Sequence, residues 1–296
     1  MNARAAMTPG DFDYIRDLLR EQSAVTLDAG KEYLVESRLA PLAHDEGFSS
    51  YQQMVSSLRA GSFRDLHRKV VETMTNNETT FLRDARVFSM IATSILPALV
   101  ARRAASRTLN IWCAACSTGQ EPYSVAMVLR DQLPSCDQWN IRIIASDLSR
   151  NVLARANAGC YSKIEINRGL PAHMLVKHFV QQGATWQVRP EIRRMVEFRE
   201  INLIQSWFDL PQMDFILMRN VLIYFDGATK KTILQRAGRL LDPDGYLLLG
   251  GAETTMNLTE AFEPVTRDGS VCFRPRQAAT RPCMDAGPNL LPMFPE

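Results

Sequence analysis

Short apolar runs alternate with longer segments of helical periodicity from about residue 76 onward. The runs 109–114 and 141–146 have the length and composition of buried strands, and a segment with apolar residues at helical spacing follows each. Further strands are expected at 195–199, 215–218 and 246–249, and a helix at 228–241. This alternation favours an α/β fold with a doubly wound, mostly parallel sheet, because parallel strands need crossover connections that helices supply. Ligands of such sheets bind beyond the carboxyl ends of the strands.

Three segments depart from this alternation. Residues 158–192 fit neither pattern and are expected to form a small inserted subdomain. The segment 266–274, with Asp268-Gly269 at its centre, has the signature of a closing hairpin. Residues 276–296 are rich in Pro and lack periodicity, so we expect a disordered tail.

The first 75 residues read as helices, with apolar residues such as Phe12, Ile15 and Leu19 at helical spacing. We therefore predict an all-α N-terminal domain over 1–75 and the sheet domain over 76–275. A cluster of cations in the first domain is more typical of a solvated face than of a binding patch. Its members are Arg59, Arg64, Arg68 and Lys69.

Composition narrows the class of protein. The 296 residues include 34 Lys and Arg against 32 Asp and Glu, and a formal net charge of +2 argues against nucleic-acid binding. We expect no membrane insertion, since no apolar stretch approaches about 18 residues and the N-terminus lacks an apolar signal region. Six cysteines are too few for a disulfide scaffold. We expect a cytoplasmic protein with reduced thiols.

The segment WCAAC at 112–116 has the spacing of a thioredoxin-type redox motif. Such a site needs its first Cys at a helix N-terminus, where the helix dipole lowers the thiol pKa, but Cys113 closes a strand. We therefore disfavour redox or zinc chemistry, and interpret the small side chains as allowing a ligand close to the backbone. His173 and His178 would face different sides of a helix, so no metal site is predicted.

Acidic residues follow the first two predicted strands. In STGQEP (117–122), Thr118 and Glu121 have the spacing of a capping box, or Glu121 faces a cationic group of a ligand. Asp147 closes the second strand, where it either caps the next helix together with Ser149 or accepts hydrogen bonds from ribose hydroxyls. Because both acids follow successive strands of one sheet, a ribose-bearing ligand is favoured.

Amide and hydroxyl side chains gather in three other segments. NNETTFLRD (76–84) joins the helical region to the sheet and has the composition of a lid more than of a linker. Asn220 in MRNVLIYF (218–225) and Asn202 in INL (201–203) each follow a strand. Their amides suit an adenine edge or an amino-acid group, and the alternative is a plain turn residue.

In this order the segments resemble the CheR family of chemotaxis receptor methyltransferases over residues 10–274. The resemblance rests on five separated motifs, namely N-x-T-x-F-x-R, A-x-S-T-G-x-E-P-Y, the strand-end Asp, Asn-Leu and R-N-V-x-I-Y-F. It implies a Rossmann-like class I methyltransferase domain with a small inserted β-subdomain, behind an all-α N-terminal domain. It also implies that the protein uses S-adenosylmethionine, with S-adenosylhomocysteine as product and no metal, to form methyl esters on receptor glutamates for sensory adaptation.

The resemblance assigns site residues by their position in the motifs. The implied catalytic residues are Arg83 and Tyr224. The implied cofactor contacts are Asn77, Thr79, Arg83, Glu121, Asp147, Asn202, Leu203, Asn220 and Val221. The implied partners are the cytoplasmic domains of methyl-accepting chemotaxis receptors. Two alternatives stay open: a methyltransferase for another protein or a small molecule, and a non-catalytic module that binds S-adenosylmethionine or S-adenosylhomocysteine.

Two departures from the family pattern affect partner binding. In the family a basic helix of the N-terminal domain is expected to dock on the receptor, whereas the second helix here keeps Lys31 and Arg38 but has Pro41 and His44. The inserted subdomain is short around 181–188 compared with members that bind a receptor's C-terminal tether peptide. We therefore expect receptor methylation that is independent of a tether, and we expect a monomer.

Overall fold

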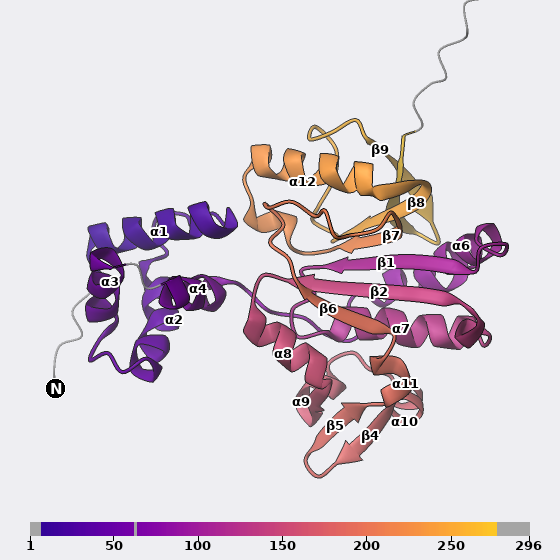
Figure 1. The fold of residues 1–296 in the computed structure, drawn as a ribbon, viewed down its shortest axis with the longest axis horizontal. Coiled ribbons are helices and arrows are strands. Elements are labelled where there is room, and N and C mark those ends of the chain that lie inside the picture. The colour runs from indigo at the N-terminus through magenta and orange to yellow at the C-terminus, as the bar shows by residue number, and fades with distance from the viewer. Residues whose placement is uncertain (1–6, 62–63, 277–296) are drawn as a thin grey trace, which may run out of the picture.

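The computed structural model describes residues 7–61 and 64–276, which form a helical part and a sheet part (Figure 1). The tail that we expect to be disordered lies, from residue 277 on, outside the described residues. The helical part, at the left of Figure 1, precedes the sheet in the chain. Its helices are α1 (Pro9–Ser23), α2 (Glu32–Asp45), α3 (Tyr51–Ala60) and α4 (Arg64–Met74).

The helical part has a core of its own. Helix α1 begins after Thr8, whose hydroxyl accepts a hydrogen bond from the Asp11 amide at 3.2 Å. Apolar residues at helical spacing on α1 and α2, such as Ile15 and Leu39, are fully buried in one cluster, against which Leu148 of the sheet part packs. The all-α N-terminal architecture is therefore confirmed.

Seven strands of the described chain form the main sheet, in the order β6-β2-β1-β7-β8-β10-β9. The first five strands in this order pair in parallel, and the last two form an antiparallel hairpin. The predicted mostly parallel sheet and closing hairpin are confirmed. The strands are β1 (Thr108–Ala114), β2 (Asn140–Asp147), β6 (Val196–Glu200), β7 (Met213–Met218), β8 (Leu241–Leu249), β9 (Phe262–Arg267) and β10 (Ser270–Pro275).

Helices cover both faces of the main sheet. Successive side chains of a strand point to opposite faces: Ile111 and Cys113 of β1 join the core on the α7 side, whereas Trp112 and Ala114 join the core on the α12 side. Figure 1 shows α7 and α12 on opposite sides of the sheet. The helices that follow strands β1, β2 and β7 are α7 (Gln120–Gln132), α8 (Arg150–Ala158) and α12 (Gly227–Leu240).

One helix is more apolar than we expected. Elements α5 (Ala85–Met90), η1 (Ile91–Ile95) and α6 (Leu96–Arg102) form a continuous helix of 18 residues with a mean hydropathy of 1.3, which by length and composition could cross a membrane. The expectation that no segment approaches this length is therefore wrong. Buried side chains of this helix, such as Ile95 and Leu99, belong to the core on the α7 side of the sheet. A third of the helix is buried in this way, so core packing accounts for part of its apolar composition.

A small antiparallel sheet in the order β3-β5-β4 follows α8 and lies below the main sheet in Figure 1. Tyr161 anchors it, because its ring packs edge-on against Phe81 with centroids 4.9 Å apart and its hydroxyl donates to the Thr118 carbonyl at 2.7 Å. The predicted inserted β-subdomain is thus confirmed. Its elements are β3 (Cys160–Ser162), α9 (Lys163–Asn167), α10 (Ala172–His178), β4 (Phe179–Gln182), β5 (Thr185–Val188) and α11 (Pro190–Arg193).

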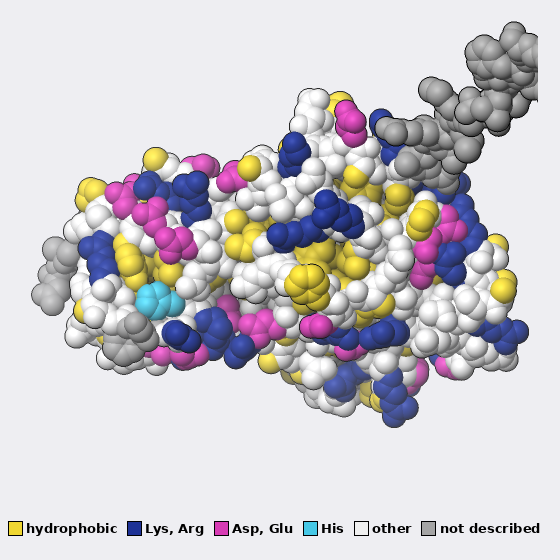
Figure 2. All heavy atoms as spheres, turned by 45° about the horizontal axis from the view of Figure 1, so that its top comes forward, with side chains coloured by type: hydrophobic (Ala, Val, Ile, Leu, Met, Phe, Trp, Pro, Cys, Tyr) yellow, Lys and Arg dark blue, Asp and Glu magenta, His cyan; other side chains and the backbone are white. Residues whose placement is uncertain are grey.

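Acidic and basic side chains are interspersed on the face shown in Figure 2, in keeping with the formal net charge of +2. In the cation cluster of the helical part, Lys69 Nζ lies 3.2 Å from an Asp65 carboxylate oxygen, and Arg68 also pairs with Asp65. Arg59 lies 3.3 Å from a carboxylate oxygen of Asp11. These pairs favour the interpretation of the cluster as a solvated face.

Candidate functional site

A cavity of about 410 Å³ lies at the carboxyl ends of β1, β2 and β7, between the sheet part and the helical part. This volume falls within the usual range for small-molecule sites. The structure brings all residues that the resemblance assigns to the site into the lining of this one cavity: Asn77, Thr79, Arg83, Glu121, Asp147, Asn202, Leu203, Asn220, Val221 and Tyr224.

The loop after β1 carries the backbone sharply into helix α7. Ala115 and Ser117 have positive φ angles of 56° and 51°, and Gly119 has φ 94°. A Cβ at Gly119 would lie 2.9 Å from the Cβ of Ala156, so glycine is required for the close approach of α8. The small residues of this loop thus let β1, α7 and α8 converge beside the cavity.

Of the two alternatives for Thr118 and Glu121, the structure excludes the capping box at the start of α7. Gly119 is the N-cap residue and provides no side-chain cap, while the Thr118 hydroxyl donates to Oε1 of Gln120 at 2.8 Å. Glu121 is instead paired with Arg219, whose Nη1 donates to Oε2 of Glu121 at 2.8 Å. Glu121 therefore lines the cavity with its carboxylate paired to a cation from the end of β7, and it does not cap α7 through a capping box.

Arg219 is a buried cation that our sequence analysis did not assign to the site. Its side chain is only 1% exposed. Besides Glu121, it pairs with Asp84 and donates from Nη2 to the Arg83 carbonyl at 3.0 Å. Burial raises the pKa of Glu121, and the Arg219 charge opposes this shift. Arg219 thus links the Glu121 carboxylate at the start of α7 to residues 83 and 84 of the 76–84 segment.

Asp147 at the end of β2 is buried and hydrogen-bonded to backbone amides. The Ser117 amide donates to Oδ2 at 2.9 Å, and the Ser149 amide donates to Oδ1 at 3.0 Å. Burial raises the pKa of Asp147, and these amide donors oppose the rise. The hydroxyl of Ser149 caps α8 by accepting from the Val152 amide at 3.4 Å. The turn after β2 is therefore held by both residues, and Asp147 also lines the cavity.

Arg83 and Tyr224 reach the cavity from distant parts of the chain. Arg83 donates from Nη1 to the Glu78 carbonyl at 3.2 Å. The Tyr224 hydroxyl accepts from Nδ2 of Asn76 at 2.9 Å, and the Tyr224 carbonyl accepts from the Thr26 amide at 2.9 Å. The segment after β7 is therefore fixed from both the helical part and the 76–84 segment.

Asn202 and Asn220 are held in different ways, the first through its side chain and the second through its backbone. The Asn202 side chain acts as a turn residue, because Oδ1 accepts from the Ile204 amide at 3.2 Å and Nδ2 donates to the Gln22 carbonyl at 2.7 Å. Asn220 has a positive φ of 59°, and its backbone N–H donates to Oε2 of Glu253 at 2.8 Å. The turn-residue alternative thus describes the Asn202 side chain, and its contact with a cofactor stays a prediction.

The cysteines of WCAAC are unsuited to thiol chemistry. Cys113 and Cys116 are buried, and burial raises the pKa of both thiols well above its ordinary value. His178 lies with Nε2 3.1 Å from Oδ1 of Asp131, away from the cavity. Within residues 7–61 and 64–276, no group of three or more His, Cys, Asp or Glu side chains is placed to hold a metal ion.

The fold and the cavity define a class of protein. A mostly parallel sheet with acids after two adjacent strands, lining a cavity at the carboxyl edge, is the Rossmann-like arrangement that binds a nucleotide-type ligand. The chain belongs to the CheR family: residues 10–75 match the CheR methyltransferase, all-alpha domain, and residues 77–270 match the CheR methyltransferase, SAM binding domain. It is therefore a methyltransferase that uses S-adenosylmethionine.

Curated relatives extend over nearly the whole chain. The chain is similar to chemotaxis protein methyltransferase 1 of Pseudomonas aeruginosa, with 37% identity over 271 residues, which cover 89% of this chain and 97% of the relative. It is 36% identical over 280 residues to chemotaxis protein methyltransferase 1 of Vibrio cholerae, covering 91% and 98% of the two chains. It is 32% identical over 268 residues to the chemotaxis protein methyltransferase of Salmonella typhimurium, covering 88% and 90%.

Proposed function

We propose that this protein methylates glutamate side chains on the cytoplasmic domains of chemotaxis receptors, forming glutamate methyl esters. The observation that carries the proposal is the meeting of Arg83 and Tyr224 with the carboxylates of Glu121 and Asp147 in one cavity. The names of the relatives support chemotaxis receptors as the acceptors.

The cavity residues suit the parts of S-adenosylmethionine. A partly buried carboxylate, Glu121, would hold the cationic amino group, and Asp147 would accept hydrogen bonds from the ribose hydroxyls. When bound, S-adenosylmethionine supplies an activated methyl group: a carboxylate oxygen bonds to the methyl carbon as the sulfonium–carbon bond breaks, leaving a neutral thioether and a neutral ester. The remaining proposed contacts are Asn77, Thr79, Arg83, Asn202, Leu203, Asn220 and Val221.

The chemistry requires alignment more than proton transfer. An acceptor glutamate with a pKa of about 4.3 is ionised at neutral pH, so no general base is needed. Opposite charges cancel as the methyl group is transferred, so exclusion of water and alignment of the reactants favour the reaction. Near-attack positioning alone contributes about 7–11 kcal/mol in well-oriented systems.

We assign Arg83 to orienting the acceptor carboxylate and Tyr224 to positioning it through its hydroxyl. Arg83 has to bind the carboxylate weakly, because a strong ion pair stabilises the charged ground state more than the charge-depleted transition state. Tyr224 is suited to positioning, since Asn76 holds its hydroxyl and Thr26 holds its carbonyl.

The test is a transfer assay with methyl-labelled S-adenosylmethionine and purified receptor cytoplasmic fragments. The proposal predicts label on receptor glutamates that mild base releases as methanol. An Arg83→Ala variant, which keeps the acids of the cavity, serves as the control for enzyme-dependent transfer. Label on a different acceptor would indicate another methyltransferase activity, and cofactor binding without transfer would indicate a binding module; either result refutes the proposal.

We also propose how the protein recognises its acceptor. Charge-driven docking through α2 is weak, because Arg38 is committed to the Met74 and Thr75 carbonyls, at 2.6 and 3.0 Å. Strands β4 and β5 have four residues each, which supports methylation that does not depend on a receptor's C-terminal tether. Equal methylation rates for receptor fragments with and without the tether are expected, and faster methylation of the tethered fragment would contradict this.

Domain boundaries, oligomeric state and location complete the proposal. We propose a helical domain over 1–75 and a methyltransferase domain over 76–275, with the inserted subdomain at about 158–192. The separate core of the helical part supports the first boundary. We propose that the protein is cytoplasmic. We also propose that it is a monomer, and light scattering of the purified protein would test this oligomeric state.

A further inference from the structure

We infer, on the basis of the proposed contact between Asp147 and the cofactor, that Glu72 of helix α4 is a positioning residue for the cofactor site. Glu72 belongs to the helical part, and its side chain does not line the cavity. It holds the turn after β2 that carries Asp147. The helical part would then complete the cofactor site as well as cover it.

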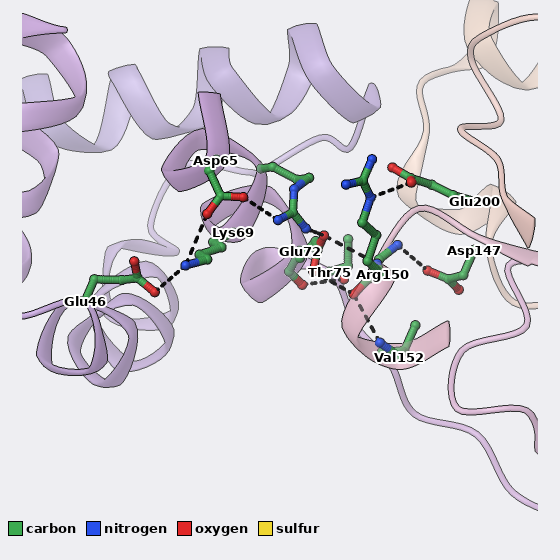
Figure 3. A network of polar contacts seen from close by, with 11 residues as sticks. Glu46, Asp65, Lys69, Glu72, Thr75, Asp147, Arg150, Val152 and Glu200 are labelled. Atoms are coloured by element: carbon green, nitrogen blue, oxygen red, sulfur yellow. Dashed lines mark hydrogen bonds and ion pairs between the residues drawn. The ribbon is translucent and has the colours of Figure 1, made fainter. Parts of the chain in front are cut away.

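Glu72 is buried where α4 meets the first turn of α8 (Figure 3). Its side chain is 3% exposed. The Ser149 hydroxyl donates to Oε2 of Glu72 at 3.1 Å, and the Arg150 amide donates to Oε1 at 3.4 Å. Arg68, one turn earlier on α4, pairs with Oε1 and compensates the buried charge.

Ser149 transmits this contact to the cavity. Its hydroxyl donates to Glu72 and accepts from the Val152 amide at 3.4 Å, while its own amide donates to Oδ1 of Asp147 at 3.0 Å. Ser149 is 1% exposed, so water cannot easily replace these contacts. The orientation of the Asp147 carboxylate therefore depends on a residue that Glu72 fixes from the other part of the molecule.

The sequence of α8 explains why the carboxylate comes from outside. A helix N-terminus carries a partial positive charge that an acidic residue stabilises, but the first turn of α8 contains no acidic residue. Arg150, in that first turn, instead pairs with Glu200 of β6 (Figure 3). Glu72 adds a second carboxylate to this N-terminus, beside Asp147, and accepts hydrogen bonds from the Ser149 hydroxyl and the Arg150 amide.

The test measures S-adenosylhomocysteine binding and turnover in full-length variants. Glu72→Ala is expected to raise the Kd for S-adenosylhomocysteine about tenfold, because it removes two hydrogen bonds to a charged acceptor. The isosteric Glu72→Gln keeps one acceptor oxygen and is expected to have a smaller effect. At saturating S-adenosylmethionine, kcat of both variants should stay within about twofold of the parent, since Asp147 does not touch the acceptor.

Asp65→Asn is the matched control. Asp65 shares Arg68 and Lys69 with the same network, but its side chain is 66% exposed and does not contact the turn after β2. This variant should bind S-adenosylhomocysteine as the parent does. Hydrogen exchange adds a readout that needs no ligand: the amides of 149–152 should exchange faster in Glu72→Ala than in Asp65→Asn.

Three outcomes would overturn the inference: an unchanged Kd in Glu72→Ala, an equal rise of Kd in Asp65→Asn, or equal exchange rates at 149–152 in both variants. Failure to methylate receptor fragments would refute the proposed function and leave the Kd comparison intact. A parent protein that does not bind S-adenosylhomocysteine would refute both.

Discussion

Substitution of Arg219 by Met removes a buried charge from the centre of the site. The Arg219 side chain is 1% exposed and contacts Oε2 of Glu121 at 2.8 Å as well as Asp84 and the Arg83 carbonyl. Methionine occupies much of the same space without a charge. The variant therefore leaves the Glu121 carboxylate largely shielded from water and without its Arg219 partner.

The expected loss of stability follows from the exposure of the two acids. Removing one partner of a buried ion pair costs about 3–5 kcal/mol. Asp84 is 53% exposed, so water replaces its lost partner at a cost of less than about 1 kcal/mol. The Glu121 side chain is 13% exposed and carries most of the effect. For a protein of this size the loss corresponds to a decrease in Tm of the order of 10 °C.

The loss of stability is expected to depend on pH. Burial raises the pKa of Glu121 and Arg219 opposes the rise, so in Arg219→Met the pKa of Glu121 rises further. The pKa of a glutamate in the unfolded state is about 4.3. An acid whose pKa is higher than this in the folded state stabilises the fold at pH values below the unfolded pKa. This contribution is lost as pH rises through the folded pKa. The difference between parent and variant should thus be largest near neutral pH and smaller in mildly acidic buffer.

Chemical denaturation of parent and variant at two pH values measures this difference. A double variant, Arg219→Met with Glu121→Gln, should be more stable than Arg219→Met at neutral pH, because the unpaired charge is gone. Equal losses at both pH values, or a double variant no more stable than the single one, would refute the reasoning.

Other variants and reagents test the remaining site residues. Arg83→Ala should reduce turnover far more than affinity for S-adenosylhomocysteine; equal losses, by calorimetry and a methyl-transfer assay, would mean that Arg83 only binds cofactor. Tyr224→Phe should lower kcat about tenfold, as expected for one positioning hydrogen bond, and an unchanged kcat would remove the hydroxyl from the mechanism. Burial raises the pKa of the Cys113 and Cys116 thiols, so iodoacetamide should label them in denatured protein but not in native protein. The partly exposed Cys160 should be labelled in both. Label found at Cys113 of the native protein by mass spectrometry would contradict the burial of this thiol.

Much of the fold could be predicted because its signals are local. The runs 109–114 and 141–146 are apolar, short and followed by helical periodicity, and they became β1 and β2 with bounds shifted by one residue. The expectation that no apolar stretch approaches 18 residues failed at 85–102, because Ser, Thr and Arg residues interrupt the apolar runs of this helix. Averaged over 18 residues, those polar side chains do not offset the Ile and Leu residues between them.

The site was predictable only where a motif marked it. Asp147 and Asn220 stand at strand ends, and the sequence marks such positions. The partner of Glu121 is Arg219, 98 residues further along the chain, so the local capping-box spacing was misleading. Glu72 lies 77 residues before Ser149, and no pattern within α4 distinguishes it from other charged residues of that helix. Such contacts arise only when segments distant in the chain pack together: α7 and the segment after β7 for Glu121 and Arg219, and the helical part and the sheet part for Glu72 and Ser149.

Alternate side chains of β1 pack into two different cores, and this limits where residues can be inserted or deleted in chains with this fold. Trp112 and Ala114 face one core and Ile111 and Cys113 the other. Deletion of a single residue within this strand would exchange the two sets, so that indole and thiol would each have to fit the space shaped for the other. Insertions and deletions should therefore accumulate in the connections at the opposite, amino-terminal edge of the sheet, such as 103–107 and 133–139, while the edge that carries the cavity keeps a constant spacing.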